Sequence, residues 1–301
     1  MKYAITGGAG FIGSNIAKLL TKKGHQVIII DNLHTGNLSR LIDIQKEITF
    51  HKIDIRDYEK MKEVIINIDG IFHQAALTAV PESFLKPEEY FDVNVNGTKN
   101  VFMIAKKLGV KVVFASSSSI YGDVKEVPIK ENFDKNPINP YGKTKVEKEK
   151  LAEKFWDESV SIIGLRYFNV YGKGQTGTYA GVITQFMKKL DDNLSPIIHG
   201  KGNQIRDFIS VEDVAIANLK SMESNSNQGF FNIGTGKSIS ILELAKMMIR
   251  ISSKDVSPNF DKEQPGDIEK SQADTLLSKE KIDWSYNIEL SDGLRKLMNE
   301  S

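Results

Sequence analysis

Three glycines at three-residue spacing stand near the start of the chain, and they constrain its fold more than any other feature. Residues 7–13 read Gly-Gly-Ala-Gly-Phe-Ile-Gly, after a short apolar run at 3–6 and before a helical pattern near 11–23. Small residues let a backbone approach a pyrophosphate, and a helix N-terminus supplies N–H groups and a positive dipole end. A strand, this loop and a helix in this order predict the first unit of a dinucleotide-binding sheet.

The rest of the first half alternates apolar runs with helical patterns. Apolar runs occupy 26–30, 48–52, 70–73, 111–115 and 160–167, and helical patterns lie near 57–66, 88–108 and 141–157. Alternation of this kind predicts an α/β fold with a Rossmann-like, doubly wound parallel sheet and helices on both faces. We therefore expect a dinucleotide-binding domain over residues 1–168.

The sequence pattern changes beyond residue 168, where the apolar and helical segments become shorter and glycine-rich stretches appear at 172–181 and 199–203. Two capping-box patterns, Ser210-x-x-Asp213 and Ser240-x-x-Glu243, each precede a helical run. These features predict a smaller mixed α/β lobe over 169–301, with some strands and helices crossing back to the first domain. Such a lobe would cap the carboxyl edge of the sheet, where ligands of these folds bind.

Composition excludes several classes of protein. The net charge is +1, so no overall field recruits nucleic acid or an anionic membrane, and the chain has no cysteine for disulfides or thiolate chemistry. The five histidines show no metal-ligand spacing, so no metal site is predicted. No apolar run is long enough to span a bilayer, and a strand at the N-terminus leaves no room for a signal peptide. We expect a cytoplasmic enzyme.

Two aspartates follow predicted strands where a dinucleotide would bind. Asp31 comes directly after the second strand, eighteen positions past Gly13, where a carboxylate would bind an adenosine ribose hydroxyl. A carboxylate there repels a 2′-phosphate, so NAD is favoured over NADP. Asp54 ends the third strand and is placed to meet the adenine, although an ordinary strand-end aspartate is nearly as good an interpretation.

The spacing Tyr-x-x-x-Lys occurs three times, with its tyrosine at 58, 121 or 141. A tyrosine and a lysine four apart share a helix face, where the ammonium lowers the pKa of the phenol. Context favours Tyr141 and Lys145, because Asn139 and Pro140 suit the first positions of a helix. That helix follows a run of four serines, 116–119, which begins where a strand ends and so faces the ligand crevice. A serine-rich loop without function is an equally good interpretation of that run alone.

Taken together, the ordered motifs resemble the extended short-chain dehydrogenase/reductases, and among them the nucleotide-sugar 4-epimerases. The resemblance covers nearly the whole chain and rests on Gly7-x-x-Gly10-x-x-Gly13, Asp31-Asn32, Asp54-Ile55, His73-Gln74-Ala75-Ala76, Asn94-Val95-Asn96-Gly97-Thr98, the serine run, Tyr141-x-x-x-Lys145, 166–172, Arg206-Asp207-Phe208, Pro265-Gly266-Asp267 and Ala273-Asp274. Each motif is modest, but their order and spacing are specific.

The resemblance implies a mechanism. In such epimerases a tyrosine phenolate takes the proton of the sugar 4′-hydroxyl while hydride passes from C4′ to NAD and later returns to the other face. Tyr141 would be that base, Lys145 would hold the ribose and depress the pKa of the tyrosine, and Ser117 would position the 4′-oxygen. Asn169 and Arg206 would hold the diphosphate.

The resemblance also implies two sets of binding residues. Cofactor contacts are expected from Gly7, Gly10, Phe11, Ile12, Gly13, Asp31, Asn32, Asp54, Ile55, Gln74, Ala75, Ala76, Thr78, Asn94, Ser116, Tyr141, Lys145 and Tyr167. Substrate contacts are expected from Thr78, Ser117, Ser118, Tyr141, Asn169, Val182, His199, Arg206, Asp267 and Ser271. His199 would lie against the uracil, although a plain loop histidine is about as good an interpretation.

Departures from related enzymes narrow the predicted chemistry. Sugar-nucleotide 4,6-dehydratases carry an acidic pair where this chain has Ser118 and Ser119, so elimination lacks its acid and base. Ser271 stands where a bulky residue closes the pocket beside C2 in glucose-restricted members, so an N-acetyl group would fit unless this serine is merely a small surface residue. Gln264 replaces an arginine that usually grips the diphosphate, which weakens the nucleotide assignment.

The leading hypothesis is an NAD-dependent 4-epimerase of UDP-hexoses that favours UDP-N-acetylglucosamine and UDP-N-acetylgalactosamine, with possible activity on UDP-glucose and UDP-galactose. Alternatives are a UDP-glucose-restricted or UDP-glucuronate 4-epimerase, a nucleotide-sugar reductase and, more distantly, a non-catalytic NAD-sensing protein. By analogy with the family, the helices near 88–108 and 141–157 would pair two subunits into a homodimer through a four-helix bundle.

Overall fold

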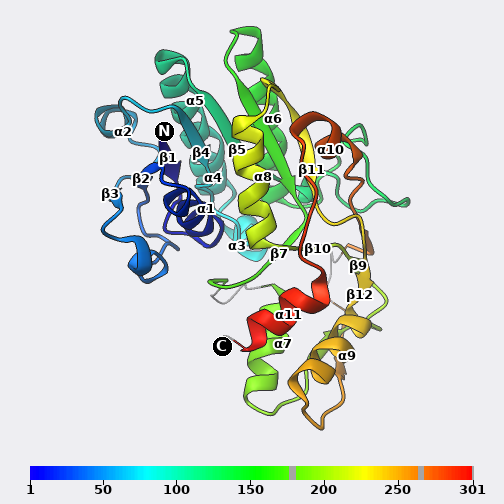
Figure 1. Ribbon diagram of the computed structural model, residues 1–301. Coiled ribbons are helices and arrows are strands. Elements are labelled where there is room, and N and C mark those ends of the chain that lie inside the picture. The colour runs from blue at the N-terminus through cyan, green and yellow to red at the C-terminus, as the bar shows by residue number, and fades with distance from the viewer. Residues whose placement is uncertain (176–180, 264–267, 300–301) are drawn as a thin grey trace.

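The computed structural model describes residues 1–175, 181–263 and 268–299, and within them a seven-stranded parallel sheet dominates one lobe (Figure 1). Its strands are β1 (Lys2–Thr6), β2 (Gln26–Ile30), β3 (Ile48–His51), β4 (Gly70–His73), β5 (Lys111–Ser117), β6 (Ile162–Tyr167) and β11 (Gln228–Ile233). Their order across the sheet is β11-β6-β5-β4-β1-β2-β3, and every neighbouring pair is parallel. The predicted Rossmann-like, doubly wound α/β fold is confirmed.

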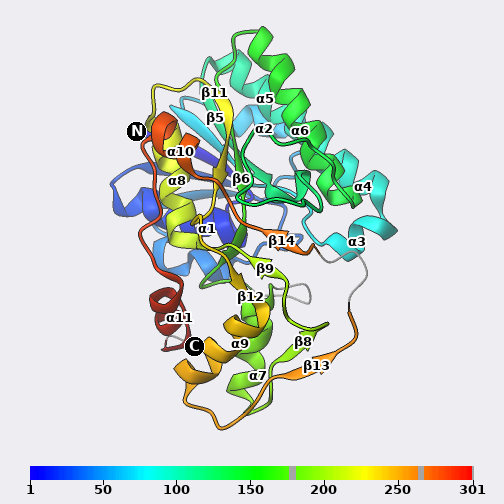
Figure 2. The ribbon, with the colours of Figure 1, turned by 90° about the vertical axis from the view of Figure 1, so that its right-hand side faces the viewer.

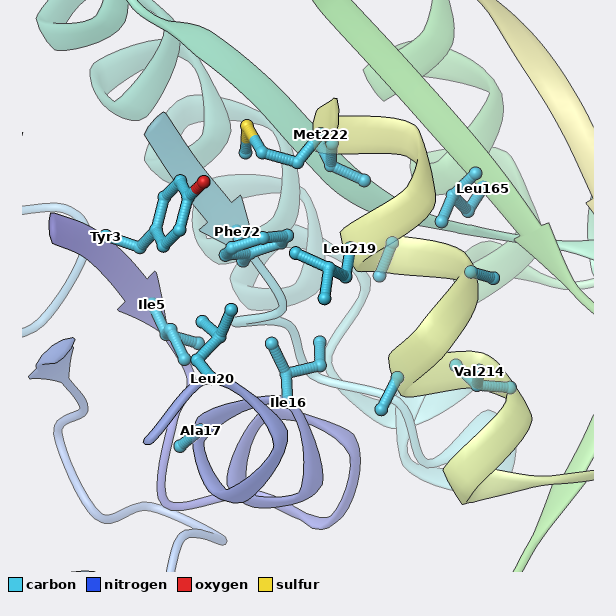
Figure 3. Close-up of a cluster of buried hydrophobic side chains, with 14 of the residues drawn as sticks. Tyr3, Ile5, Ile16, Ala17, Leu20, Phe72, Leu165, Val214, Leu219 and Met222 are labelled. Atoms are coloured by element: carbon cyan, nitrogen blue, oxygen red, sulfur yellow. The ribbon is translucent and has the colours of Figure 1, made fainter. Parts of the chain in front are cut away.

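Helices cover both faces of this sheet. On one face, α1 (Phe11–Lys22) and α8 (Val211–Glu223) pack on side chains of β1 and β4, as Figure 3 shows for Leu20, Leu219 and Phe72. The opposite face buries apolar side chains of α2 (Tyr58–Val64), α5 (Gly97–Leu108) and α6 (Pro140–Asp157). The inner strands are apolar runs because they are buried on both faces, whereas the edge strand β3 is only partly buried.

The segment predicted as one helix over 88–108 is divided. It consists of α4 (Pro87–Phe91), the π-helical turn η2 (Asp92–Asn96) and α5, and a separate short helix α3 (Val80–Leu85) precedes it. The π turn holds Asn94 in the interior, where its side chain bonds both backbone groups of Leu77 and the Thr144 hydroxyl. Satisfying those buried groups explains why regular helix is interrupted there.

The second lobe is built mostly from the C-terminal half of the chain (Figure 2). Its core joins α7 (Val182–Asp191), α9 (Ile241–Ser252) and α11 (Leu290–Asn299). Short strands pair around it in three small sheets: β7 (Asn169–Tyr171) with β10 (Phe208–Ser210), β8 (Ile197–His199) with β13 (Asn259–Asp261), and β9 (Ile205–Arg206) with β12 (Ile239–Ser240) and β14 (Lys270–Ser271). Three elements from this half return to the large lobe: β11, α8 and α10 (Leu276–Ile282).

The two predicted capping boxes have different outcomes. The box of Ser240 and Glu243 is confirmed, with both reciprocal hydrogen bonds formed at the start of α9. The prediction of a capping box formed by Ser210 and Asp213 is wrong. Ser210 does cap α8 by accepting from the Glu212 amide, but Asp213 is buried and accepts from the amides of 287 and 288 instead. A distant chain segment therefore competes successfully for that carboxylate.

Minor elements complete the described chain, namely the 3-10 turns η1 (Leu38–Ile44) and η3 (Ser118–Ile120). Trp156 and Trp284 pack among apolar residues of the large lobe and donate to the carbonyls of Ile162 and Asp213. No helix in the described ranges is both long and apolar enough to cross a membrane.

Candidate active site

A cavity of about 610 Å³ opens at the carboxyl ends of β1, β2, β4 and β5. Of the residues predicted to contact a cofactor, all except Asn94 line it. The described lining also includes residues that were not predicted: Ile30, His34, Thr35, Arg40, Ile53, Arg56, Leu77, Ala79, Glu82, Glu89, Val93, Ala115 and Gln175.

The glycine loop leaves no room for a side chain at Gly7 or Gly13. A Cβ on Gly7, whose φ is +70°, would lie 2.6 Å from the amide nitrogen of Ala75, and one on Gly13 would lie 2.2 Å from the carbonyl oxygen of Gly7. Helix α1 begins after Gly10 without a side-chain cap, so no side chain competes for its first-turn N–H groups. A closely packed backbone beside an uncapped helix N-terminus fits the pyrophosphate of a dinucleotide.

Asp31 lies at the next strand end and is held rigidly. Its carboxylate accepts from the amides of Ala9 at 3.0 Å and Leu33 at 2.8 Å, and burial raises its pKa against the effect of those bonds. Arg40 spans this corner by donating to the carbonyls of Ala9, at 3.1 Å, and Gly174, at 2.9 Å. The loop after β7 is thereby attached to the glycine loop.

Asp54 is held by its own neighbour. Arg56 donates to both carboxylate oxygens, at 3.0 and 2.8 Å, and Asn32 donates to one of them at 2.9 Å. The hydrogen bonds from Arg56 keep the pKa of Asp54 well below its usual range. Asp54 and Arg56 thus form one planar, charge-assisted pair in the cavity wall. A basic residue two positions after a strand-end aspartate was the only signal for Arg56.

Tyr141 and Lys145 enter the cavity from the first turns of α6. The predicted start of this helix is confirmed, because the Asn139 side chain accepts from the Gly142 amide at 2.8 Å and Pro140 occupies the first turn. The Lys145 Nζ lies 5.3 Å from the centre of the Tyr141 ring and donates to the carbonyl of Ala115 at 3.0 Å. The end of β5 therefore fixes the lysine beside the tyrosine.

Burial shapes the protonation of this pair. It raises the pKa of Tyr141 to about 12, while a hydrogen bond with the Ser117 side chain acts in the opposite direction. Burial also lowers the pKa of Lys145 to about 8, while the negative charge of Glu149 acts to raise it. With a pKa of about 8, Lys145 is still mostly charged at neutral pH, beside the Tyr141 ring.

The other two Tyr-x-x-x-Lys matches lie outside the cavity lining. Tyr58 and Lys62 are on α2, where Lys62 forms a surface ion pair with Glu59. Tyr121 is buried, and its hydroxyl bonds Asn232 and Arg166. Of the three tyrosines, Tyr141 is the one that reaches the cavity.

The residues predicted to hold a substrate are distributed over both lobes. Thr78 and Tyr141 line the cavity, and Ser117 and Ser118 stand where β5 passes into η3. Asn169 on β7 donates to the carbonyl of Asp207 at 3.0 Å.

In the second lobe, Arg206 and Ser271 are partners in the register of β9 and β14, and Ser271 is 6% exposed. Val182 begins α7 and His199 ends β8, and neither belongs to the cavity lining. Gln264 and Asp267 lie outside the described residues.

The structure gives Asn94 a different surrounding from the one predicted. It is fully buried, and its amide bridges Leu77 in the cavity wall to Thr144, whose hydroxyl donates to the carbonyl of Tyr141. Direct contact of Asn94 with a cofactor stays a prediction, whereas its link to the wall and to α6 is structural.

A parallel sheet with a glycine-rich first turn, a strand-end aspartate and a helix-borne Tyr-Lys pair define a class, the short-chain dehydrogenases and reductases. The sequence profile of the "NAD dependent epimerase/dehydratase family" matches residues 3–234. The chain belongs to this family, and its members are enzymes.

Individual proteins similar to this chain belong to the same family. A putative UDP-glucose 4-epimerase of Methanocaldococcus jannaschii is 38% identical over 98% of this chain and 96% of its own length. The solved UDP-N-acetylglucosamine 4-epimerase of Methanobrevibacter ruminantium, in complex with UDP-N-acetylmuramic acid, is 34% identical with a TM-score of 0.95 and coverage of 99% and 97%. The UDP-glucose 4-epimerase of Thermotoga maritima, solved with UDP-glucose, is 34% identical with a TM-score of 0.94 and coverage of 99% and 98%.

Proposed function

We propose that the protein is an NAD-dependent 4-epimerase of UDP-hexoses and that it favours the N-acetylated pair UDP-N-acetylglucosamine and UDP-N-acetylgalactosamine. One observation carries this proposal. Tyr141 and Lys145 lie side by side in the wall of the cavity, Tyr141 is hydrogen-bonded to the Ser117 side chain, and the two residues after Ser117 are serines, which supply no acid or base. The class of the relatives supports the same reaction.

NAD fits the cavity. The backbone of the glycine loop and the first turn of α1 would hold its pyrophosphate, and Asp31 would accept from the adenosine ribose. The pair of Asp54 and Arg56 would stand at the adenine. Bound NAD supplies a reversible acceptor for the hydride of the sugar carbon.

The chain's own residues supply the proton chemistry. The Tyr141 hydroxyl would accept the proton of the sugar 4′-hydroxyl and return it, and Ser117 would orient that hydroxyl by hydrogen bonding. Because burial raises the pKa of Tyr141 to about 12 even with the Ser117 hydrogen bond, the base needs the positive charge of Lys145 beside it. That charge is lost above about pH 8.

Ser271 supports the choice of sugar. It is a small buried residue that is the register partner of Arg206 across β14 and β9. The residue proposed to contact the sugar, Ser271, and the residue proposed to contact the diphosphate, Arg206, therefore lie on one small sheet. A serine there leaves space for an N-acetyl group that a bulky residue would exclude. UDP-glucose would also be accepted, with fewer contacts at C2.

The proposal is tested by incubating purified protein and NAD with UDP-N-acetylglucosamine or UDP-glucose and following the C4 epimers by NMR, without added reductant. We expect conversion of both, faster for the N-acetylated sugar, and a loss of about 10³-fold in Tyr141→Phe with NAD affinity retained in calorimetry. Both sugars unchanged at C4 would overturn the proposal. Stoichiometric change in NADH absorbance would instead indicate a reductase.

We also propose a homodimer that buries α5 and α6. The adjoining α3 and α4 expose Phe84, Leu85 and Phe91, which are 60%, 81% and 45% exposed in a single chain. Light scattering after size exclusion would measure the mass, and a monomer at micromolar concentration would contradict this.

A further inference from the structure

A cluster of buried charged side chains lies on the inner face of α6 and on β6. It contains Lys145, Lys148, Glu149 and Arg166, and none of the four is more than 1% exposed. Only Lys145 belongs to the cavity lining. Buried charges are expensive unless they are paired, so the arrangement of this cluster calls for an explanation.

Glu149 is the negative member of the cluster, and its oxygens are fully used. Arg166 donates to both of them, at 2.9 and 2.8 Å, and Lys135 reaches one at 2.9 Å. The Ser116 hydroxyl, which belongs to the cavity lining, donates to Glu149 at 2.7 Å. Ser116 is the direct neighbour of Ser117, so the carboxylate anchors the strand end that presents both serines.

We propose that Glu149 is a positioning residue of the active site, which anchors Ser116 and places a negative charge one helical turn from Lys145. The proposal rests on the proposed function, because it takes Lys145 as the partner of Tyr141. Glu149 lies one helical turn beyond Lys145 and therefore shares its face of α6.

Electrostatics agree with this role. Burial lowers the pKa of Lys145 to about 8, and Glu149 is the charge that acts in the opposite direction. Burial of Glu149 raises its own pKa, but Arg166 and Lys135 outweigh that effect and hold the pKa below its usual range. The carboxylate is thus ionised across the range in which Lys145 titrates.

Other titratable groups near Glu149 do not replace it. On α6, Lys148 is a second buried amine whose Nζ donates at 3.4 Å to the same Ala115 carbonyl as Lys145. Burial and then the charge of Lys145 hold the pKa of Lys148 well below its usual value. From β4, His73 is neutral, because burial and then the two lysines lower its pKa.

The remaining titratable neighbours have other partners or are exposed to solvent. Glu153 lies on the outer part of α6 and pairs with Lys135 at 3.6 Å. The Tyr121 hydroxyl and the backbone carbonyl of Glu131 accept from Arg166, and the Glu131 carboxylate accepts from the Asn232 amide. The titratable residue of β5, Lys111, caps α8 at the opposite end of the strand, and α5 exposes its lysines 99, 106 and 107 to solvent. Among the described residues, Glu149 is the fully buried carboxylate of this cluster.

The test compares two substitutions that change the charge in opposite directions. Glu149→Gln keeps the shape but removes the negative charge, and Lys135→Met removes a positive charge from the partly exposed side of Glu149. Protein labelled with ¹³Cε-lysine is titrated by NMR without cofactor, and the Lys145 signal is assigned with Lys145→Met. In parallel, kcat for UDP-N-acetylglucosamine is measured against pH.

We expect the Lys145 midpoint to fall by about one pH unit in Glu149→Gln, and the alkaline limb of kcat to fall with it. Lys135→Met should move both in the opposite direction by a smaller amount. If Glu149→Gln does not fold, Lys135→Met still decides the question, because Lys135 is partly exposed.

Unchanged midpoints in the folded variants, or a lower rate with an unchanged pH profile, would overturn the proposal in favour of a purely structural role. The NMR titration needs neither substrate nor NAD. A wild-type protein without epimerase activity would therefore refute the proposed function and leave the assignment of Glu149 to be decided by the midpoints.

Discussion

We expect the buried amine of Lys148 to destabilise the folded protein. Its side chain is fully buried, its amine has one hydrogen bond of 3.4 Å to Ala115, and no carboxylate pairs with it among the described residues. Methionine has nearly the same length and no charge, so Lys148→Met removes the buried amine and preserves the packing against Phe114. We expect the variant to be more stable at neutral pH.

Two known costs set the range for the gain in stability expected from Lys148→Met. Burying a polar group without a good partner costs about 1–3 kcal/mol in protein substitutions. A lysine with an ordinary pKa of 10.5 costs no more than about 5 kcal/mol when folding keeps it neutral at pH 7. We therefore expect Lys148→Met to raise the free energy of unfolding by about 2 kcal/mol at pH 7.

The sign of the pH dependence follows from the lowered pKa of Lys148. Between the lowered pKa of the folded state and 10.5, the unfolded chain holds a proton that the folded chain lacks, so the penalty is present at neutral pH and disappears as the pH rises through 10.5. The advantage of Lys148→Met should therefore shrink by at least half between pH 7 and pH 9.5 (~1.4 kcal/mol per pH unit at most).

Urea unfolding at the two pH values measures this, with fluorescence from Trp156 and Trp284, which both pack in the large lobe. Lys150→Met is the matched control, because Lys150 is exposed on the same helix and pairs only with Glu147. Its effect should stay within about 0.5 kcal/mol. Destabilisation by Lys148→Met, or a gain that does not change with pH, would refute the reasoning.

Two further predictions concern binding. Gly13→Ala places a Cβ 2.2 Å from the Gly7 carbonyl oxygen, so we expect about 2 kcal/mol lower stability by urea unfolding. NAD affinity should fall at least about tenfold in calorimetry. An affinity equal to that of the wild type would contradict the proposed role of the glycine loop in binding the pyrophosphate. Ser271→Tyr fills the space proposed for the N-acetyl group and should lower kcat/KM for UDP-N-acetylglucosamine by about 10–200-fold. Activity on UDP-glucose should change by less than about threefold, and equal losses for both sugars would speak against the assignment of Ser271.

Much of the large lobe could be predicted, because its inner strands are short apolar runs that are buried on both faces. The runs at 26–30 and 70–73 coincide with β2 and β4. What could not be predicted is where β11 belongs. Its sequence, Gln-Gly-Phe-Phe-Asn-Ile, is compatible with a strand but does not indicate which strand it pairs with. The pairing with β6 is a contact between segments far apart in the chain. The outcome at Asp213 has the same cause, since its partners at 287 and 288 are distant in sequence.

The cavity lining was predictable for a different reason. Glycines, strand-end aspartates and the Tyr-Lys pair each have a local spacing that reflects their place at a sheet edge. Lys148 and Glu149 were missed because the run Lys-Val-Glu-Lys-Glu-Lys at 145–150 has the composition of a solvated helix face. The available signal was their position one turn beyond Lys145, on the face that packs against β5. Only the tertiary structure shows that this face is buried.

The place of β11 has a consequence for how the protein is made. The large sheet is complete only when Ile233 has been synthesised, because β11 then covers the open edge of β6. Helix α8, which covers the apolar face shown in Figure 3, also emerges late. Until then, a nascent chain carries all the residues of the cavity together with an unpaired strand edge and an uncovered apolar face, features that promote aggregation. The described residues 211–233 do not line the cavity, yet the sheet that carries the cavity is complete only with them.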